Sequence, residues 1–302
     1  MSSLKEIKAR IASVGSTLKI TSAMKMVSSA KLRKVQNVIA GHEAYKSALL
    51  DILSELAGYL PESELAAGGG AGNVAVVAFS SNTSLCGAFN SNVARALDRE
   101  VAALVAEGRA VTVFPVGEKV AKAAHRAGYP VDDTYAAVAD KGTFSDASDL
   151  AERLMKGYLE GEFCKVVLLY TRYISAARQQ ITVEEFLPVA DSSRFAADAA
   201  CGSLHAEDSD AGLGFADDFE EFIVEPSKKE LFAKLLPLAL HTQVYATLLS
   251  SSASEHAARM IAMQTATDNA TDLLAELQLT YNKQRQQAIT EELTDISNGK
   301  LV

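Results

Sequence analysis

The side chains best suited to covalent chemistry lie in the segment SSNTSLCGAFN, residues 80–90. Ser84 and Cys86 are possible nucleophiles there, because a hydroxyl or thiol can attack a substrate once a neighbouring base removes its proton. No histidine or carboxylate is tied to either residue by its spacing. The sequence therefore does not support a catalytic site. We interpret the segment as a strand-to-helix turn capped by Asn90 or Ser91.

Cysteine and histidine can bind metals, but their spacing here does not favour a metal site. The three cysteines form no CxxC pair, and the five histidines show no HxxxH or HExxH spacing. An odd number of widely spaced cysteines also predicts no disulfide framework and indicates a reducing compartment. The residues concerned are Cys86, Cys164, Cys201, His42, His125, His205, His241 and His256.

Two glycine-containing segments resemble phosphate-binding loops only superficially. The run GGGAG at 68–72 precedes a predicted strand and has no Lys-Ser/Thr after it. A phosphate loop must follow a strand, so that the N–H groups of the next helix point at the phosphate. Residues 80–90 do follow a strand, but Gly87 is their one glycine, and a dinucleotide site needs three. We therefore expect no bound cofactor.

The charge of the chain is unevenly distributed. The 302 residues carry 29 basic and 38 acidic side chains, a net charge of −9. Residues 1–40 hold eight basic side chains against one acid, Glu6, so this segment is at +7 and the remainder at −16. The acidic total argues against a nucleic-acid-binding protein. No stretch approaches 18 uninterrupted apolar residues, so we expect no membrane span.

The N-terminal segment has the apolar spacing of a long helix. Leu4, Ile7, Ile11, Val14 and Leu18 alternate at intervals of three and four, as in a coiled-coil seam. Beyond Leu18 we expect the seam to drift through Met24, Val27, Val35 and Val38. No proline precedes Pro61, so one helix is predicted from about Leu4 to Ala57, on the order of 80 Å long.

The C-terminal segment shows the same pattern. Its predicted seam consists of His256, Met260, Met263, Thr267, Ala270, Leu274, Leu277 and Tyr281, continued after a phase shift by Ile289, Leu293 and Ile296. Residues 254–298 contain no proline or glycine. Residues 231–249 are also predicted to be helical. Pro237 should kink that stretch or mark its first turn. Ser254 is a possible local helix start.

The two long helices are expected to pair. Several seam residues are small or polar, which lets backbones approach closely: Thr17, Thr21, Ala23, Ala30, Thr267 and Ala270. Neither helix can bury its stripe alone, and the chain reverses between them, so an antiparallel coiled coil is predicted. The alternative is two separate amphipathic helices packed on the middle domain.

The middle of the chain alternates predicted strands and helices. The strands are expected at 73–79, 110–116, 164–173 and 180–187, with a possible last strand at 219–224. The helices are expected at 90–107, 118–127 and 145–160, the last capped by Ser145 or Asp146. This order predicts an α/β domain with a mostly parallel sheet. Residues 191–221 are acidic and indicate a solvated loop.

The predicted fold class is therefore α/β, with a Rossmann-like domain inserted between the two halves of a long antiparallel coiled coil. The predicted domains are the N-terminal helix at 1–60, the α/β domain at 73–224 and the C-terminal helix at 226–302.

Four motifs, in order along nearly the whole chain, resemble the gamma subunit of F-type ATP synthases. They are IKARIASVGSTLKITSAMKMVSSAKLRK at 7–34, LCGAFN at 85–90, SEHAARMIAMQTATDN at 254–269 and YNKQRQQAITEELTDISNG at 281–299. Leu85, Cys86, Gly87 and Asn90 match the family's loop after its first strand.

The resemblance implies a rotor shaft of bacterial type. It implies partners in the alpha and beta subunits, the epsilon subunit and the membrane c ring, on the cytoplasmic face of the inner membrane. Rotation driven by proton or sodium flow would change the nucleotide affinity of each beta site, where the ATP chemistry resides, so this chain would not be an enzyme. The residues implied to contact the surrounding ring are Lys8, Arg10, Met24, Lys31, Arg33, Arg259, Arg285, Gln286, Thr290 and Glu291.

Two alternatives make different predictions. A nucleotide-binding α/β enzyme with a dimerising coiled coil predicts a phosphate loop or a dinucleotide fingerprint, and the sequence has neither. A coiled-coil scaffold predicts charged residues flanking the seam and no α/β insert.

Overall fold

The computed structural model describes residues 4–66, 72–140, 142–189, 224–225 and 227–299. The chain forms two compact units. One, the helix-pair unit, consists of Met1–Lys31 and Arg259–Val302, and the other, the α/β unit, is Leu32–Ala258. We describe each unit by itself. The three-part division at 1–60, 73–224 and 226–302 follows chain order and remains a prediction.

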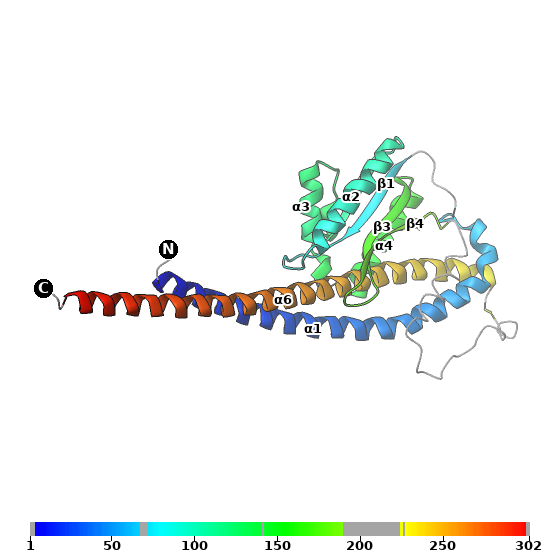
Figure 1. The fold of residues 1–302 in the computed structure, drawn as a ribbon. Coiled ribbons are helices and arrows are strands. Elements are labelled where there is room, and N and C mark those ends of the chain that lie inside the picture. The colour runs from blue at the N-terminus through cyan, green and yellow to red at the C-terminus, as the bar shows by residue number, and fades with distance from the viewer. Residues whose placement is uncertain (1–3, 67–71, 141, 190–223, 226, 300–302) are drawn as a thin grey trace. The chain divides into compact units, whose positions relative to one another are not determined.

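Two long helices contribute residues to both units. Helix α1 spans Leu4–Glu55 and α6 spans Lys228–Gly299, close to the predicted extents of both helical ends. Within the helix-pair unit they lie side by side and run in opposite directions (Figure 1). The predicted antiparallel pairing of the terminal helices is therefore confirmed within this unit.

Helix α6 is continuous where the sequence suggested interruptions. Pro237 lies inside it and not in its first turn. Ser254 does not start a helix, because it is fully buried in the middle of α6 and its Oγ donates to the Thr171 carbonyl at 3.0 Å. Burial and packing of this helix outweigh one missing N–H donor at the proline.

The α/β unit contains a four-stranded sheet in the order β2-β1-β3-β4. Its strands are β1 (Asn73–Phe79), β2 (Val111–Val116), β3 (Phe163–Tyr173) and β4 (Gln179–Leu187). Strand β1 pairs in parallel with both β2 and β3, while β4 pairs antiparallel with β3. The strands predicted at 73–79, 110–116, 164–173 and 180–187 are confirmed, as is the pairing of the fourth beside the third.

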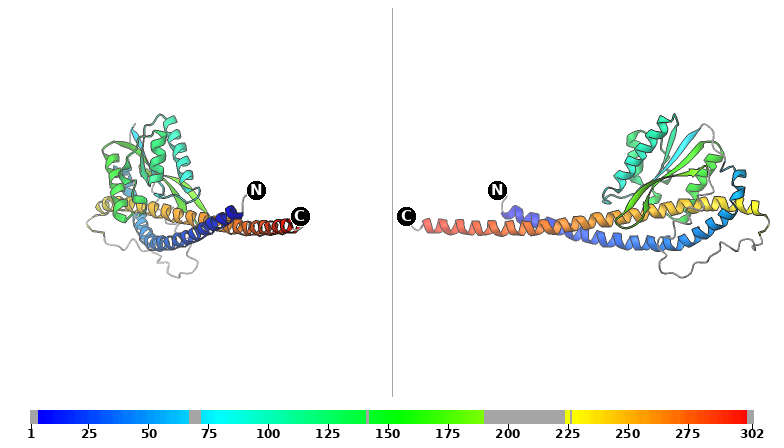
Figure 2. Two further views of the ribbon diagram at one scale, coloured as in Figure 1. Left: turned by 90° about the vertical axis from the view of Figure 1, so that its left-hand side faces the viewer. Right: turned by 45° about the vertical axis from the view of Figure 1, so that its right-hand side comes forward.

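Helices cover both faces of this sheet. Helices α2 (Phe89–Ala106) and α3 (Glu118–Ala127) pack on one face against Val74, Val76 and Ala78 of β1. Helix α4 (Phe144–Leu159) and the parts of α1 and α6 in this unit pack on the other, against Ala75, Val77 and Phe79. Figures 1 and 2 show this layering. Alternate residues of a strand point to opposite faces, which is why β1 is apolar throughout.

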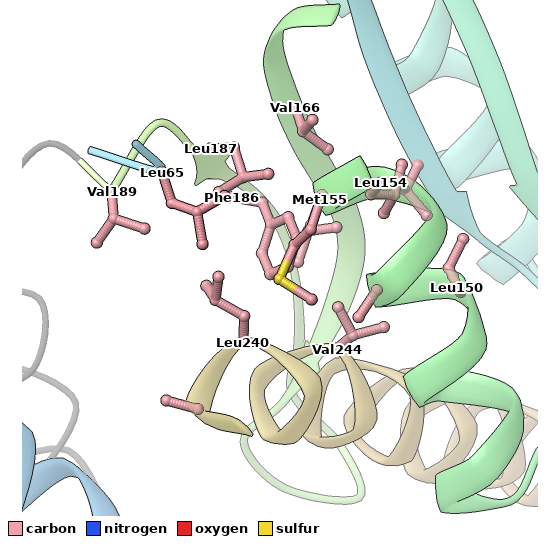
Figure 3. Close-up of a cluster of buried hydrophobic side chains, with 14 of the residues drawn as sticks. Leu65, Leu150, Leu154, Met155, Val166, Phe186, Leu187, Val189, Leu240 and Val244 are labelled. Atoms are coloured by element: carbon pink, nitrogen blue, oxygen red, sulfur yellow. The ribbon is translucent and has the colours of Figure 1, made fainter. Parts of the chain in front are cut away.

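The larger core joins the sheet to α6. Leu150, Leu154 and Met155 of α4 lie beside Phe186 and Leu187 at the end of β4, and Leu240 and Val244 of α6 complete the cluster (Figure 3). Most of these side chains are almost fully buried. At about 1.5–3 kcal/mol for each fully buried large apolar side chain, this contact fixes α6 firmly to the sheet.

Two predicted helix caps are wrong. Helix α4 is capped by Thr143, whose hydroxyl accepts from the Asp146 N–H while the Asp146 carboxylate accepts from the Thr143 N–H and hydroxyl. This capping box makes Asp146 the third helical residue and not the cap. Helix α2 has Ala88 at its cap, because the Asn90 side chain is engaged in the preceding loop.

Short 3₁₀ turns complete the described chain at Ala57–Glu62, Asp133–Tyr135 and Val138–Asp140. The predicted acidic loop at 191–221, most of the possible strand at 219–224 and most of the GGGAG run lie outside the described residues.

Candidate interaction surfaces

The seam of the helix-pair unit contains small and polar side chains. Ile7, Thr21 and Ser28 of α1 are buried, as are Met263 and Ala270 of α6. The Thr267 hydroxyl is 3.0 Å from that of Thr21, across the seam. It also lies 2.7 Å from the Met263 carbonyl, to which a hydroxyl can donate. Hydroxyls bonded in this way can be buried without a large free-energy cost.

The predicted seam is correct for α6 up to Tyr281 but partly wrong for α1. Thr21, Ser28 and, in the α/β unit, Leu32 are buried, while Val27 is 57% and Val38 40% exposed. The interval of three and four therefore continues without the predicted drift. Of the small residues predicted for the seam of α1, Thr21 is buried, whereas Thr17, Ala23 and Ala30 are exposed and lie outside it.

The far end of α6 has no partner helix among the described residues. Because Thr21 lies opposite Thr267 in an antiparallel pair, Leu4 lies opposite about residue 284 of α6. Ile289 is 48% exposed, and Leu293 and Ile296 are each 61% exposed. The predicted continuation of the seam through these three residues is wrong, because α1 does not reach them. They instead form an exposed apolar surface at the tip of α6.

The predicted contact residues at this tip are all exposed. They are Arg285, Gln286, Thr290 and Glu291. The Thr290 hydroxyl donates to the Gln286 carbonyl at 2.9 Å, one turn earlier in the helix. The helical period places Arg285, Gln286 and Thr290 on the same side of α6 as Ile289 and Leu293. This side offers both charge and apolar area to another molecule.

The predicted basic contacts differ in their surroundings. Lys8, Arg10, Lys31 and Arg33 are exposed on α1, while Met24 is half-buried. Arg259 of α6 is only 8% exposed. The chain itself covers most of that guanidinium, so Arg259 offers another molecule much less surface than the other predicted residues.

The terminal helices are tied to the sheet by hydrogen bonds within the α/β unit. Gln36 of α1 donates to the Tyr173 hydroxyl at 2.9 Å, and the Tyr173 N–H donates to Ser250 Oγ of α6 at 3.0 Å. Gln243 of α6 donates to Glu184 of β4 at 2.6 Å. These directional contacts resist rotation of α1 and α6 about their own axes relative to the sheet.

The polar groups of the loop after β1 form hydrogen bonds with one another. Asn90 Oδ1 accepts from the Ser81 N–H at 3.2 Å and from its hydroxyl at 2.9 Å, and Asn90 Nδ2 donates to Cys86 Sγ at 3.1 Å. Cys86 is 2% exposed, so its thiol is not an accessible nucleophile. Leu85 and Gly87 have positive φ, at 70° and 58°, which produces the tight turn. Leu85 is 55% exposed and is the residue of this motif that another molecule could contact.

The same loop occupies the N-terminus of α3. The Glu118, Lys119 and Val120 N–H groups donate to Asn82 Oδ1, the Ser81 carbonyl and Ser80 Oγ, at 3.0, 3.2 and 3.0 Å respectively. These are the N–H groups that a phosphate would need at this helix. The loop therefore acts as the cap of α3, a role that sequence reasoning missed because the two segments are far apart in the chain.

The described residues offer neither a metal-binding cluster nor a membrane-spanning helix. In the part of the chain that the structure describes, no group of three histidine, cysteine or acidic side chains could hold a metal ion. None of the described helices is both long and apolar enough to cross a membrane.

Comparison with known proteins identifies relatives over the full length. The ATP synthase family model matches residues 3–300. The ATP synthase gamma chain of Bacteroides thetaiotaomicron is 45% identical over 304 aligned positions, which cover 100% of both chains. The ATP synthase gamma chain of Flavobacterium johnsoniae is 41% identical, over 99% of this chain and 98% of its own.

Solved structures share the fold. A chain in the Euglena gracilis mitochondrial ATP synthase structure that comprises OSCP, F1 and c-ring aligns with a TM-score of 0.62 at 20% identity, over 99% of this chain and 93% of its own. A chain from the central stalk and c-ring of Tetrahymena thermophila mitochondrial ATP synthase aligns with a TM-score of 0.55 at 23% identity, over 82% of this chain and 99% of its own.

Proposed function

This chain belongs to the ATP synthase gamma chain family, and we propose that it is the rotor subunit of the central stalk. In that role it couples proton or sodium flow through the membrane ring to ATP synthesis or hydrolysis at the beta subunits. The observation that carries the proposal is the pair of long antiparallel helices, of which α6 continues beyond the start of α1 with an exposed mixed surface.

The shaft role fits the construction of the two helices. A rotating shaft must transmit torque, so its helices must not turn freely relative to the sheet of the α/β unit. The hydrogen bonds from Gln36, Ser250 and Gln243 to the sheet, and the apolar contact of α6 with α4 and β4, oppose such slippage. The helices α1 and α6 belong to both units, which gives a continuous covalent path for torque.

The chain is proposed to be non-catalytic, with the ATP chemistry on the beta subunits. Two observations support this. The Cys86 thiol is buried, and the loop after β1 directs its hydrogen-bonding groups to its own turn and to α3. The alternative of a nucleotide-binding enzyme would need those groups to face a ligand.

The proposed partners are the alpha and beta subunits, the epsilon subunit and the c ring. We propose that Lys8, Arg10, Lys31 and Arg33 face acidic loops of the ring, together with the α6 group Arg285, Gln286, Thr290 and Glu291. At an effective dielectric near 20, a pair of opposite charges at 4 Å attracts by about 4 kcal/mol before desolvation. Contacts of this size can form and break as the shaft turns. Met24, Arg259 and the loop residue Leu85 remain proposed contacts.

As a gamma chain, the protein is part of a membrane-associated complex and is peripheral. We propose the cytoplasmic face of a bacterial inner membrane as its location, since the full-length relatives are bacterial.

The decisive experiment is reconstitution. The full chain is purified alone and with alpha and beta subunits, and ATP hydrolysis is measured in each preparation. We expect activity only in the assembled complex, and rotation of a bead attached to the α/β unit. Hydrolysis by the isolated chain, or failure to join the complex, would contradict the proposal.

A further inference from the structure

A hollow on the surface of the α/β unit lies outside every contact described above. It is lined by Asn92, Arg95 and Arg99 of α2 and by Ile181 of β4, and its volume is about 430 Å³. The hollow is open along one side. An open groove suits an extended chain better than a small molecule, because small-molecule sites enclose most of the ligand surface.

The groove runs beside the last strand of the sheet. Strand β4 is the last in the sheet order, and no strand in the described part of the chain pairs with its outer edge. Such an edge presents main-chain N–H and C=O groups to which another strand can add. Val183 faces the same side as Ile181, because alternate residues share a face, and it is 45% exposed despite being apolar.

The rim of the groove is positively charged. Arg95 and Arg99 are exposed, and their hydrogen bonds stay on α2: Arg95 donates to the Ser91 carbonyl and to Asn92 Oδ1, and Arg99 donates to the Arg95 carbonyl. Among the described residues, neither arginine forms an ion pair with a carboxylate. Glu185 lies on the same face of β4 as Val183, two residues further along the strand. Its carboxylate pairs with Lys165 at 3.1 Å.

We propose that this groove docks an extended acidic segment of a partner polypeptide, laid along the edge of β4. Carboxylates of the segment bind the guanidinium groups of Arg95 and Arg99, where bidentate pairing is available. Apolar residues of the segment that point to the same face as these carboxylates cover Ile181 and Val183. The inference goes beyond the rotor function and does not depend on it.

The test uses a defined probe. A fluorescein-labelled peptide of about eight residues carries glutamate and valine at every second position, so that both share one face of the strand, and threonine at the positions between them. It is titrated with the full chain, and binding is followed by anisotropy. Arg95→Glu with Arg99→Glu should weaken binding at least tenfold, and the milder Arg95→Gln with Arg99→Gln by a smaller factor. The matched control Arg126→Glu, an exposed arginine on α3, should leave binding unchanged. Circular dichroism confirms that each variant is folded.

Two further measurements distinguish docking in the groove from nonspecific attraction between opposite charges. A peptide with lysine in place of glutamate should not bind, and Val183→Ser should weaken the glutamate peptide severalfold without affecting pyrophosphate. Equal binding by wild type and the double charge reversal would overturn the proposal. It would also be overturned if pyrophosphate displaced the peptide while Val183→Ser had no effect, since the groove would then be a small-anion site.

Discussion

At the residue scale, the Asn90 side chain bonds to both ends of the loop after β1. Its oxygen accepts two hydrogen bonds from Ser81, and its nitrogen lies 3.1 Å from Cys86 Sγ and 3.4 Å from the Thr83 carbonyl. An alanine at this position would leave the Ser81 N–H without its acceptor, while the Ser81 hydroxyl would keep the Thr83 carbonyl, 2.6 Å away.

We therefore expect Asn90→Ala to lower the free energy of unfolding of the α/β unit by about 1–3 kcal/mol. Urea unfolding followed by tyrosine fluorescence measures the change. The control is Asn92→Ala, an exposed asparagine on the same helix, which should change stability little. Equal stability of the two variants would show that the loop does not depend on Asn90.

Two half-buried histidines make the α/β unit sensitive to acid. Burial is the main cause that lowers the pKa of His42 below 6.5, with Glu43 opposing and Lys46 adding to the shift. Burial also lowers the pKa of His241, opposed by Glu152. The Nε2 atom of each has no hydrogen-bond partner among the described residues.

A lowered folded-state pKa means that the unfolded chain binds protons more readily than the folded one. Stability should therefore be full above about pH 6.5 and fall as the pH drops below it, until the pH passes the folded-state values. Unfolding free energies at pH 7.5 and 5.5 measure the slope. His42→Gln with His241→Gln should flatten it. An unchanged slope in the double variant would assign the acid sensitivity to other groups.

At the element scale, helix α4 depends on the capping box at its start. Thr143→Ala removes an acceptor from the first turn and should cost about 0.5–2 kcal/mol of stability. Ser145→Ala is the matched control, because Ser145 is exposed and its side chain does not cap the helix. Thermal unfolding of both variants compares them. A larger loss for Ser145→Ala would favour the cap that the sequence suggested.

The close approach of α1 and α6 depends on small seam residues. Thr267→Leu would place a larger side chain against Thr21 and should destabilise the helix-pair unit by about 1–3 kcal/mol. Thr265→Leu, on the exposed side of the same helix, serves as the control. Amide hydrogen exchange along residues 4–31 and 259–285 reports the effect. Equal protection in both variants would mean that the seam tolerates larger side chains.

At the scale of the whole molecule, the proposed ring contacts at the tip of α6 can be tested without affecting the fold. Arg285→Ala with Gln286→Ala should reduce coupled ATP synthesis in membrane vesicles severalfold and leave helicity unchanged, because both side chains are exposed. The control Gln287→Ala changes a neighbouring exposed glutamine. Wild-type synthesis by the double variant would show that these contacts are wrongly assigned.

The sequence by itself determined the class of elements and their order. Continuous apolar runs and one alternating run indicated the strands, and apolar spacings of three and four indicated the long helices, because these patterns reflect which faces become buried. The motifs at 7–34, 85–90, 254–269 and 281–299 indicated the family that the full-length relatives show.

Tertiary structure decided where each helix finds a partner and which polar groups are used. The length of α1 relative to α6 leaves Ile289, Leu293 and Ile296 exposed, which no local pattern encodes. The capping of α3 by Asn82, the burial of Arg259 and the use of Ser28 in place of Val27 in the seam depend on segments distant in the chain. Local sequence fixes which face of a helix is apolar, but only packing decides what covers it.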